Sequence, residues 1–150
     1  MDNINRVLCL VFLSSFLICQ SSYSQSFSDE KKLYGRWILD KSKVINQIGG
    51  ESSSKINRMN EKQYLDFEES LENRIFQFKD DKTFLAFWEF KSRPYNVNGK
   101  WEITSDGKLQ LNVSGSSKLY EIKFTGNSIM LTPINSESGL LQKLFFKKIE

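Results

Sequence analysis

The sequence predicts an all-β domain, an antiparallel up-and-down barrel of about eight strands with one helix between its first two strands. Aromatic residues make up 13% of the 150-residue chain, and such side chains suit the half-buried surface of a sheet. Turn residues separate short apolar runs about every eight to twelve residues, a spacing typical of barrels and sandwiches. Residues 74–113 contain four of these runs in succession, which indicates an antiparallel meander that the rest of the chain closes.

Residues 1–24 are predicted to be a signal peptide that is removed from the folded domain. A basic residue stands just before the apolar run of residues 7–19, and this run is too short for a transmembrane helix. Small residues precede the bond between Ser24 and Gln25, where we expect cleavage. The mature domain is then residues 25–150, and it is expected to be secreted or periplasmic. The alternative is that the apolar run remains as an uncleaved anchor.

Lipidation at Cys19 is a second alternative, although a lipobox has a small residue at the position that Ile18 occupies. Cys9 and Cys19 are the two cysteines of the chain, so cleavage after Ser24 would leave the mature domain without a thiol. Such a domain has no disulfide framework, no thiolate nucleophile and no sulfur ligand for a metal. Membrane association is therefore expected only if Cys19 is lipidated.

The distribution of charge argues against a nucleic-acid partner. The formal net charge is +3, from 21 basic and 18 acidic residues, and the two signs are interspersed along the chain. A nucleic-acid binder more often has a stripe of one sign. Lys147 and Lys148 form a tight basic pair beside two phenylalanines, and we interpret them as the solvated end of a strand.

The first strand is expected at residues 32–40, with Leu33, Gly35, Trp37 and Leu39 on one face. Gly35 would let the backbone bend or approach a neighbour closely. Trp37 would then fill the space that a closing barrel leaves at its end. The alternative is an ordinary core tryptophan of a small β-domain.

A loop and then a helix are expected after the first strand. Residues 41–54 contain glycine and serine runs that break regular structure, so they are predicted to be a loop. Residues 55–73 are predicted to be a helix, because Tyr64, Phe67 and Leu71 share one helical face. The acidic residues of this helix are expected to face solvent. The helix either covers the barrel mouth as a lid or packs on the outside of the barrel.

Turn chemistry places the remaining strands. Asp106 and Gly107 are a hairpin signal, whereas residues 91–95 contain Pro94 and are expected to be a connection. The strands are expected at residues 74–79, 83–90, 96–104, 108–113, 119–124, 128–132 and 141–149.

The strand at residues 83–90 is apolar on both faces. Alternation places one set of its side chains inside the barrel: Phe84, Ala86, Trp88 and Phe90. The same alternation places Leu85 and Phe87 on the outer face. Such a strand is either buried on both sides or exposes its outer pair to a partner.

Short motifs occur in a fixed order along the chain: Gly35-Arg36-Trp37, FKDDKTF at 78–84, GKWEI at 99–103, DGKL at 106–109, LTP at 131–133 and LFFKKI at 144–149. Together they resemble the small lipocalin-like domain of secreted proteins from Bacteroidetes-type bacteria. The resemblance covers residues 33–149. It implies a barrel fold without established catalytic residues.

Two details follow from this resemblance. By similarity to lipocalins, Trp37 near Lys147 or Lys148 of the last strand would close one end of the barrel. The chain also departs from the pattern, because residues 41–73 form a longer segment than such domains usually place between their first two strands.

The residue types offer little catalytic chemistry. The chain has no histidine, which is the commonest general base and metal ligand. Asp80 and Asp81 are adjacent carboxylates, but they lie between lysines where a solvated hairpin turn is expected. Glu68, Glu69 and Glu72 share a helix, whereas calcium ligands usually come from a tight loop. We therefore predict no enzyme activity, no metal and no cofactor.

Two functions of different classes remain. In the first, a small apolar ligand binds inside the barrel among six aromatic residues: Phe76, Phe78, Trp88, Phe90, Trp101 and Tyr120. In the second, the same rings fill the barrel of a structural or protein-interaction domain. Leu85 and Phe87 on the outer face would then mark its contact surface.

Overall fold

The computed structural model describes residues 29–134 and 141–150. The predicted signal peptide, its cleavage site and Cys19 lie outside the described residues. Within the described part of the chain, no helix is both long enough and apolar enough to cross a membrane.

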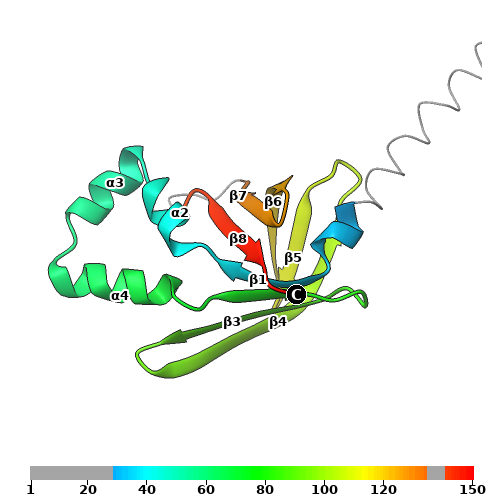
Figure 1. Cartoon of the computed structure of the whole chain (residues 1–150), viewed down its shortest axis with the longest axis horizontal. Coiled ribbons are helices and arrows are strands. Elements are labelled where there is room, and N and C mark those ends of the chain that lie inside the picture. The colour runs from blue at the N-terminus through cyan, green and yellow to red at the C-terminus, as the bar shows by residue number, and fades with distance from the viewer. Residues whose placement is uncertain (1–28, 135–140) are drawn as a thin grey trace, which may run out of the picture.

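The described residues form a barrel (Figure 1). Each strand pairs antiparallel with the next strand along the chain, and β8 pairs with β1, so the sheet of eight strands closes on itself. The predicted all-β, up-and-down barrel is therefore confirmed. The strands are β1 Gly35–Leu39, β2 Ile75–Phe78, β3 Thr83–Phe90, β4 Arg93–Ile103, β5 Leu109–Val113, β6 Ser116–Thr125, β7 Ser128–Pro133 and β8 Leu144–Lys148.

Trp37 closes one end of this barrel. Its side chain is 1% exposed, and its indole N–H donates a hydrogen bond of 2.8 Å to the carbonyl of Leu33. Nζ of Lys148 lies 5.2 Å from the centroid of the Trp37 ring, which confirms the predicted approach of a basic residue from the last strand. Leu33 belongs to a helical turn at residues 29–33 and not to β1, because the chain turns there to cover the barrel end. Its predicted place on the first strand was wrong.

Gly35 allows the close approach that the sequence predicted. Its φ is +118°, in the region that favours glycine. A Cβ added there would lie 2.1 Å from the carbonyl oxygen of Glu150. The same oxygen accepts a hydrogen bond of 3.0 Å from the backbone N–H of Arg36. The end of the chain is therefore held against β1 at a point where only a glycine fits.

The interior near Trp37 is packed with aromatic rings. Phe78 and Trp101 are each 1% exposed, and their ring centroids are 5.7 Å apart in an edge contact. Nζ of Lys82 lies 4.5 Å from the centroid of Trp101 and 2.6 Å from a carboxylate oxygen of Glu30. We call this packed region the closed end of the barrel.

The β3–β4 hairpin is longer than predicted. Lys91 and Ser92 both have a left-handed φ, 52° and 56°, and this pair alone reverses the chain. Residues 93–95 therefore pair with residues 88–90, and the prediction of a connection at 91–95 was wrong. The register of β4 with β5 begins at Lys100, so the part of β4 that contains Pro94 is an edge, where a missing N–H is tolerated.

Three helices occupy the segment between β1 and β2: α2 Lys41–Asn46, α3 Gly50–Asn57 and α4 Glu61–Leu71. The predicted loop at 41–54 was therefore wrong. The predicted helix at 55–73 is confirmed for residues 61–71, but it was wrong as one continuous helix, because α3 ends at Asn57. Asp40 begins α2, since its carboxylate accepts a hydrogen bond of 3.2 Å from the N–H of Lys43. Gly49 precedes α3 as its N-cap, so the glycine that signalled a break begins a helix.

A capping box begins α4, where Asn60 and Gln63 exchange side-chain to backbone hydrogen bonds of 2.9 Å each. The predicted apolar face is present, because Leu71 is 1% exposed and Phe67 packs against the core. The helix lies alongside β3, as Figure 1 shows. Its position brings Phe67 to the end of the barrel opposite Trp37.

Candidate functional site

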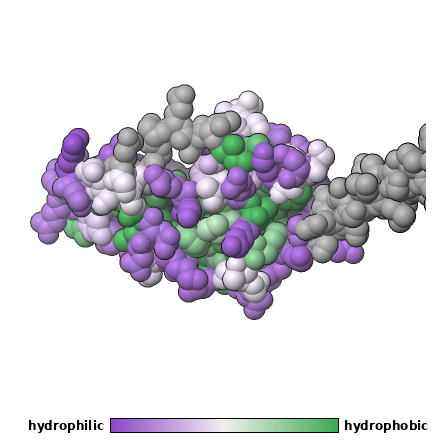
Figure 2. Space-filling view, turned by 90° about the horizontal axis from the view of Figure 1, so that it is seen from above, coloured by the Kyte–Doolittle hydropathy of each residue, from purple (hydrophilic) through white to green (hydrophobic). Residues whose placement is uncertain are grey.

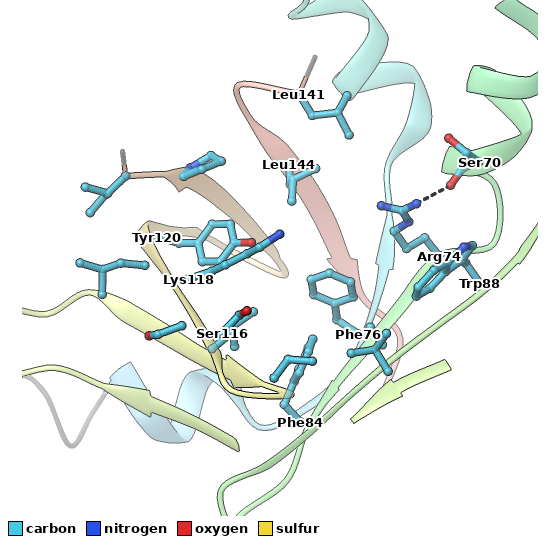
Figure 3. A pocket seen from close by; sticks show the side chains of 18 of the residues that line it. Ser70, Arg74, Phe76, Phe84, Trp88, Ser116, Lys118, Tyr120, Leu141 and Leu144 are labelled. Carbon is cyan, nitrogen blue, oxygen red and sulfur yellow. Dashed lines mark hydrogen bonds between the residues drawn. The ribbon is translucent and has the colours of Figure 1, made fainter. Parts of the chain in front are cut away.

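The end of the barrel opposite Trp37 contains a cavity of about 1050 Å³ (Figure 3). Ligand pockets in proteins usually measure about 300–1,000 Å³, so this cavity has room for a small ligand. Side chains of α4, of the segment before β2 and of strands β2 to β8 line it. We call this region the open end of the barrel.

The walls of the cavity are mainly apolar. Phe76 and Phe84 lie between the cavity and the packed interior, with ring centroids 5.1 Å apart. Phe76 also contacts the buried Phe146, at 4.5 Å between centroids. Leu111 and Leu144 add aliphatic surface from β5 and β8. Figure 2 shows apolar residues gathered at the centre of one face of the molecule, with hydrophilic residues around them.

Arg74 brings a positive charge to this apolar space. One Nη of its guanidinium donates a hydrogen bond of 2.8 Å to the carbonyl of Ser70, and Cζ lies 5.1 Å from the ring centroid of Trp88. Nε is buried and has no hydrogen-bond partner among the residues that the structure describes. Burial lowers the pKa of Arg74, but a guanidinium stays protonated at neutral pH. Arg74 is therefore a cation in the cavity wall whose guanidinium donates one hydrogen bond to the described part of the chain.

The local sequence holds the backbone of Arg74 in place. Asn73 has a left-handed φ of +50°, so the backbone changes direction there after α4. The carbonyl of Arg74 then accepts a hydrogen bond of 2.8 Å from the N–H of Leu39, which joins it to the end of β1. The side chain projects from the segment between α4 and β2 into the cavity, as Figure 3 shows.

Three acidic residues at the C-terminal end of α4 and just after it have partners other than Arg74. Asp66 pairs with Nζ of Lys91 at 2.9 Å, and Glu69 accepts a hydrogen bond of 2.7 Å from the N–H of the same residue. Glu72 pairs with Nζ of Lys41 at 2.6 Å. Aspartate and glutamate are absent from the described residues that line the cavity. The charge of Arg74 is therefore not neutralised by the described part of the chain.

Two further polar residues extend from β6 on the opposite wall. Lys118 and Tyr120 point into the cavity toward the side that carries Arg74 (Figure 3). Burial raises the pKa of Tyr120, so its hydroxyl remains a protonated donor at neutral pH. The cavity thus combines apolar walls with two cations and a phenol. Among the described residues, no group of three or more Asp, Glu, Cys or His side chains is placed to hold a metal ion.

The structure divides the six aromatic residues that were predicted to bind a ligand. Phe76, Trp88 and Tyr120 line the cavity, whereas Phe78 and Trp101 belong to the closed end. Phe90 lies at the tip of β3, where Nζ of Lys91 is 4.9 Å from its ring, and it is not part of the cavity wall. The six rings therefore do not form one site.

Sequence reasoning missed Arg74 and Lys118. Arg74 was the first residue of the predicted strand at 74–79 and Lys118 came just before the predicted strand at 119–124, and neither was given a role in the site. Each nevertheless lies an even number of positions before a residue that faces inward. Arg74 precedes Phe76 by two positions, and Lys118 precedes Tyr120 by two. Extending the alternation by one step backwards would have placed both charges inside the barrel.

The outer face of the barrel carries a separate apolar patch. Phe87 is 44% exposed and pairs across the sheet with Ile75, while Leu85 pairs with Gln77. A shallow groove of about 570 Å³ runs over these residues. Leu85 and Phe87 therefore lie on the outer face, as the alternation predicted.

A scan against protein-family models finds no match for this chain, and no curated protein is detectably similar to it in sequence. The resemblance to lipocalin-like domains of Bacteroidetes-type bacteria therefore stays a prediction.

Proposed function

We propose that this protein is a secreted, lipocalin-like binding protein that holds a small hydrophobic ligand in the open end of its barrel. The main support is the cavity of about 1050 Å³ between Phe76, Phe84 and α4. A barrel of about eight strands is just wide enough to be filled by side chains or to hold one small ligand. In this barrel, aromatic side chains fill the closed end, whereas apolar side chains surround the cavity at the open end.

The groups around the cavity favour binding over catalysis. Its titratable side chains among the described residues are Arg74, Lys118 and Tyr120. The guanidinium of Arg74 stays protonated at neutral pH, and burial raises the pKa of the Tyr120 phenol. None of the three is a ready general base, and the chain has no histidine. We therefore propose a carrier or receptor rather than an enzyme.

The localisation in this proposal comes from the N-terminal sequence. Cleavage after Ser24 would release the domain to the periplasm or the exterior, whereas lipidation at Cys19 would tether it to a membrane. Mass spectrometry of the protein from its own host distinguishes the two, because only the lipidated form carries an acyl mass on Cys19. The same native measurement would identify a retained ligand.

A pair of matched substitutions tests binding inside the cavity. Val97 lines the cavity, and its neighbour Asn96 lies on the outer groove of the same strand. N-phenyl-1-naphthylamine, an uncharged probe that fluoresces in apolar surroundings, is expected to bind the wild type. Val97→Trp should weaken this binding by about tenfold or more, since the indole would project into the space that the probe occupies. Asn96→Trp should leave it unchanged.

Two results would contradict the proposal. The first is a wild-type protein that does not bind the probe at micromolar concentrations. The second is equal binding by Val97→Trp and the wild type, which would place the probe outside the barrel. Circular dichroism of both variants controls for the fold.

A protein-interaction domain is the second candidate, and the outer patch around Phe87 favours it. In that case Phe87→Lys should abolish association, measured by sedimentation velocity with the native partner or as self-association, and leave probe binding intact. The binding-protein proposal predicts the reverse, with function lost in Val97→Trp and retained in Phe87→Lys. The two variants therefore separate the candidates.

A further inference from the structure

We propose that the ligand of the open end is an amphiphile with a carboxylate headgroup, bound by the guanidinium of Arg74, with its hydrocarbon chain directed toward Phe76 and Phe84. This inference rests on the proposed binding function and specifies the chemistry of the ligand. Its basis is a guanidinium that lines the cavity beside apolar walls and donates one hydrogen bond to the described part of the chain, in a cavity whose described lining lacks acidic residues.

The donors of Arg74 are only partly used. A guanidinium has five N–H donors in a planar fork, and one hydrogen bond to the carbonyl of Ser70 is present. Nε is buried against protein atoms and has no partner among the described residues, so a ligand reaches the guanidinium through its two terminal Nη groups, which can hold a carboxylate in a two-point contact. The neighbouring ring of Trp88 limits the directions that the guanidinium can take. The end of the guanidinium is therefore the part of Arg74 that is available to a planar anion.

The energetics favour an anion over a neutral group. Burial of a cation without a counter-charge is costly, and the direction of the pKa shift at Arg74 reflects this desolvation. Asp66 and Glu72 pair with the ammonium groups of Lys91 and Lys41, Glu69 accepts a hydrogen bond from the backbone N–H of Lys91, and none of these three carboxylates lines the cavity. A ligand carboxylate would supply the missing charge in surroundings of low dielectric, where the attraction is strong.

The opposite wall is compatible with the same charge. Lys118 and the protonated hydroxyl of Tyr120 face Arg74 across the cavity, so both walls repel a cationic ligand. Arg74 lies beside Ser70 of α4, whereas Phe84 lies at the far side of the cavity (Figure 3). The headgroup is therefore placed near α4, and the hydrocarbon chain extends toward the aromatic floor.

The experiment compares ligands of one chain length that differ only in the headgroup. Isothermal titration calorimetry at pH 8 measures the binding of hexadecanoate, hexadecanol and hexadecyl sulfate to the wild-type protein. Hexadecanoate is expected to bind about 10–100-fold more tightly than hexadecanol, as expected for a hydrogen bond to a charged group. Equal binding of the acid and the alcohol, or tighter binding of the sulfate, would overturn the carboxylate assignment.

Variants then locate the headgroup. Arg74→Met keeps a long side chain and removes the charge, so it should lose the preference for the acid and still bind hexadecanol. Arg93→Met, at an exposed arginine of β4 outside the cavity, should keep the preference. A preference that survives in Arg74→Met would overturn the role of Arg74. The wild-type comparison of acid with alcohol remains decisive even if Arg74→Met does not fold.

The two proposals fail in different ways. If the wild type binds N-phenyl-1-naphthylamine and hexadecanol but does not favour the acid, the headgroup inference is wrong and the binding function stands. If the wild type binds neither the neutral probe nor any of the hexadecyl compounds, the binding function itself is wrong.

Discussion

Replacing Trp101 with alanine is expected to destabilise the barrel far more than replacing Trp88. Both tryptophans face inward from the meander, but they occupy different ends of the barrel. Trp101 is 1% exposed and surrounded by other rings, whereas Trp88 lines the cavity. The comparison therefore measures directly which end is packed.

The expected cost at Trp101 follows from its contacts. Removal of a buried tryptophan side chain typically costs about 3–5 kcal/mol, because the surroundings relax only partly into the space. The indole N–H also donates a hydrogen bond of 3.0 Å to the carbonyl of Lys79. Edge contacts at 5.7 Å to Phe78 and to Tyr34 would be lost as well. Trp101→Ala should therefore lie near the upper end, about 4–5 kcal/mol.

The expected cost at Trp88 is smaller. Its ring stacks on Tyr95 with centroids 5.7 Å apart and lies 5.1 Å from Cζ of Arg74. Tyr95 is exposed and Arg74 is partly exposed, and the Trp88 side chain borders the cavity. Trp88→Ala opens no new closed cavity, so we expect a loss of about 1–2 kcal/mol.

Urea unfolding followed by far-ultraviolet circular dichroism gives both free energies of unfolding without relying on tryptophan fluorescence. The expected difference between the two variants is about 2–4 kcal/mol, well above the error of extrapolation. A loss at Trp88 equal to that at Trp101 would show that the open end is packed as tightly as the closed end. That outcome would refute the assignment of the two ends.

Two stability predictions remain. Gly35→Ala should lower the free energy of unfolding in urea by about 2–3 kcal/mol, because its Cβ would lie 2.1 Å from the carbonyl oxygen of Glu150. Gly126→Ala, which has open space around its Cβ, should lower it clearly less. Equal losses in the two variants would contradict the close approach at Gly35. Asp40→Ala should cost about 1 kcal/mol at pH 7. Desolvation opposes the shift, but hydrogen bonds from Lys147 and from the N–H of Lys43 lower the pKa of Asp40 from 3.8. Because the pKa of Asp40 is lower in the folded state, ionised Asp40 stabilises the fold above pH 3.8, and this stabilisation is lost as the pH falls through the folded-state pKa. The free energies of unfolding of the variant and the wild type should therefore converge near pH 2. A difference that persists at that pH would refute the role of this carboxylate.

Local patterns in the sequence were enough to predict most strands. Alternation in residues 83–90 predicted β3 with its observed bounds, and the inner and outer positions of Trp88 and Phe87 follow from the same period of two. Glycine and proline were less reliable. Gly49 begins a helix and Pro94 lies within a strand, because a cap and a free edge tolerate residues that usually interrupt regular structure.

The candidate site was predicted only in part. Phe76 and Phe78 share a face of β2, but only Phe76 reaches the cavity. Both side chains point to the inside of the barrel, but they lie at different positions along the barrel axis. Those positions depend on the stagger of all eight strands around the closed sheet.

The sequence by itself determined the fold class, the faces of the strands and the glycine at position 35, because these depend on neighbours a few residues away along the chain. Only the tertiary structure decided which rings fill the barrel and which surround space. It also decided that Arg74 has no ion-pair partner in the described part of the chain, where Asp66 of α4 and Glu72, which follows α4, pair with Lys91 and Lys41. Such contacts join residues that are distant in sequence, and no local pattern records them.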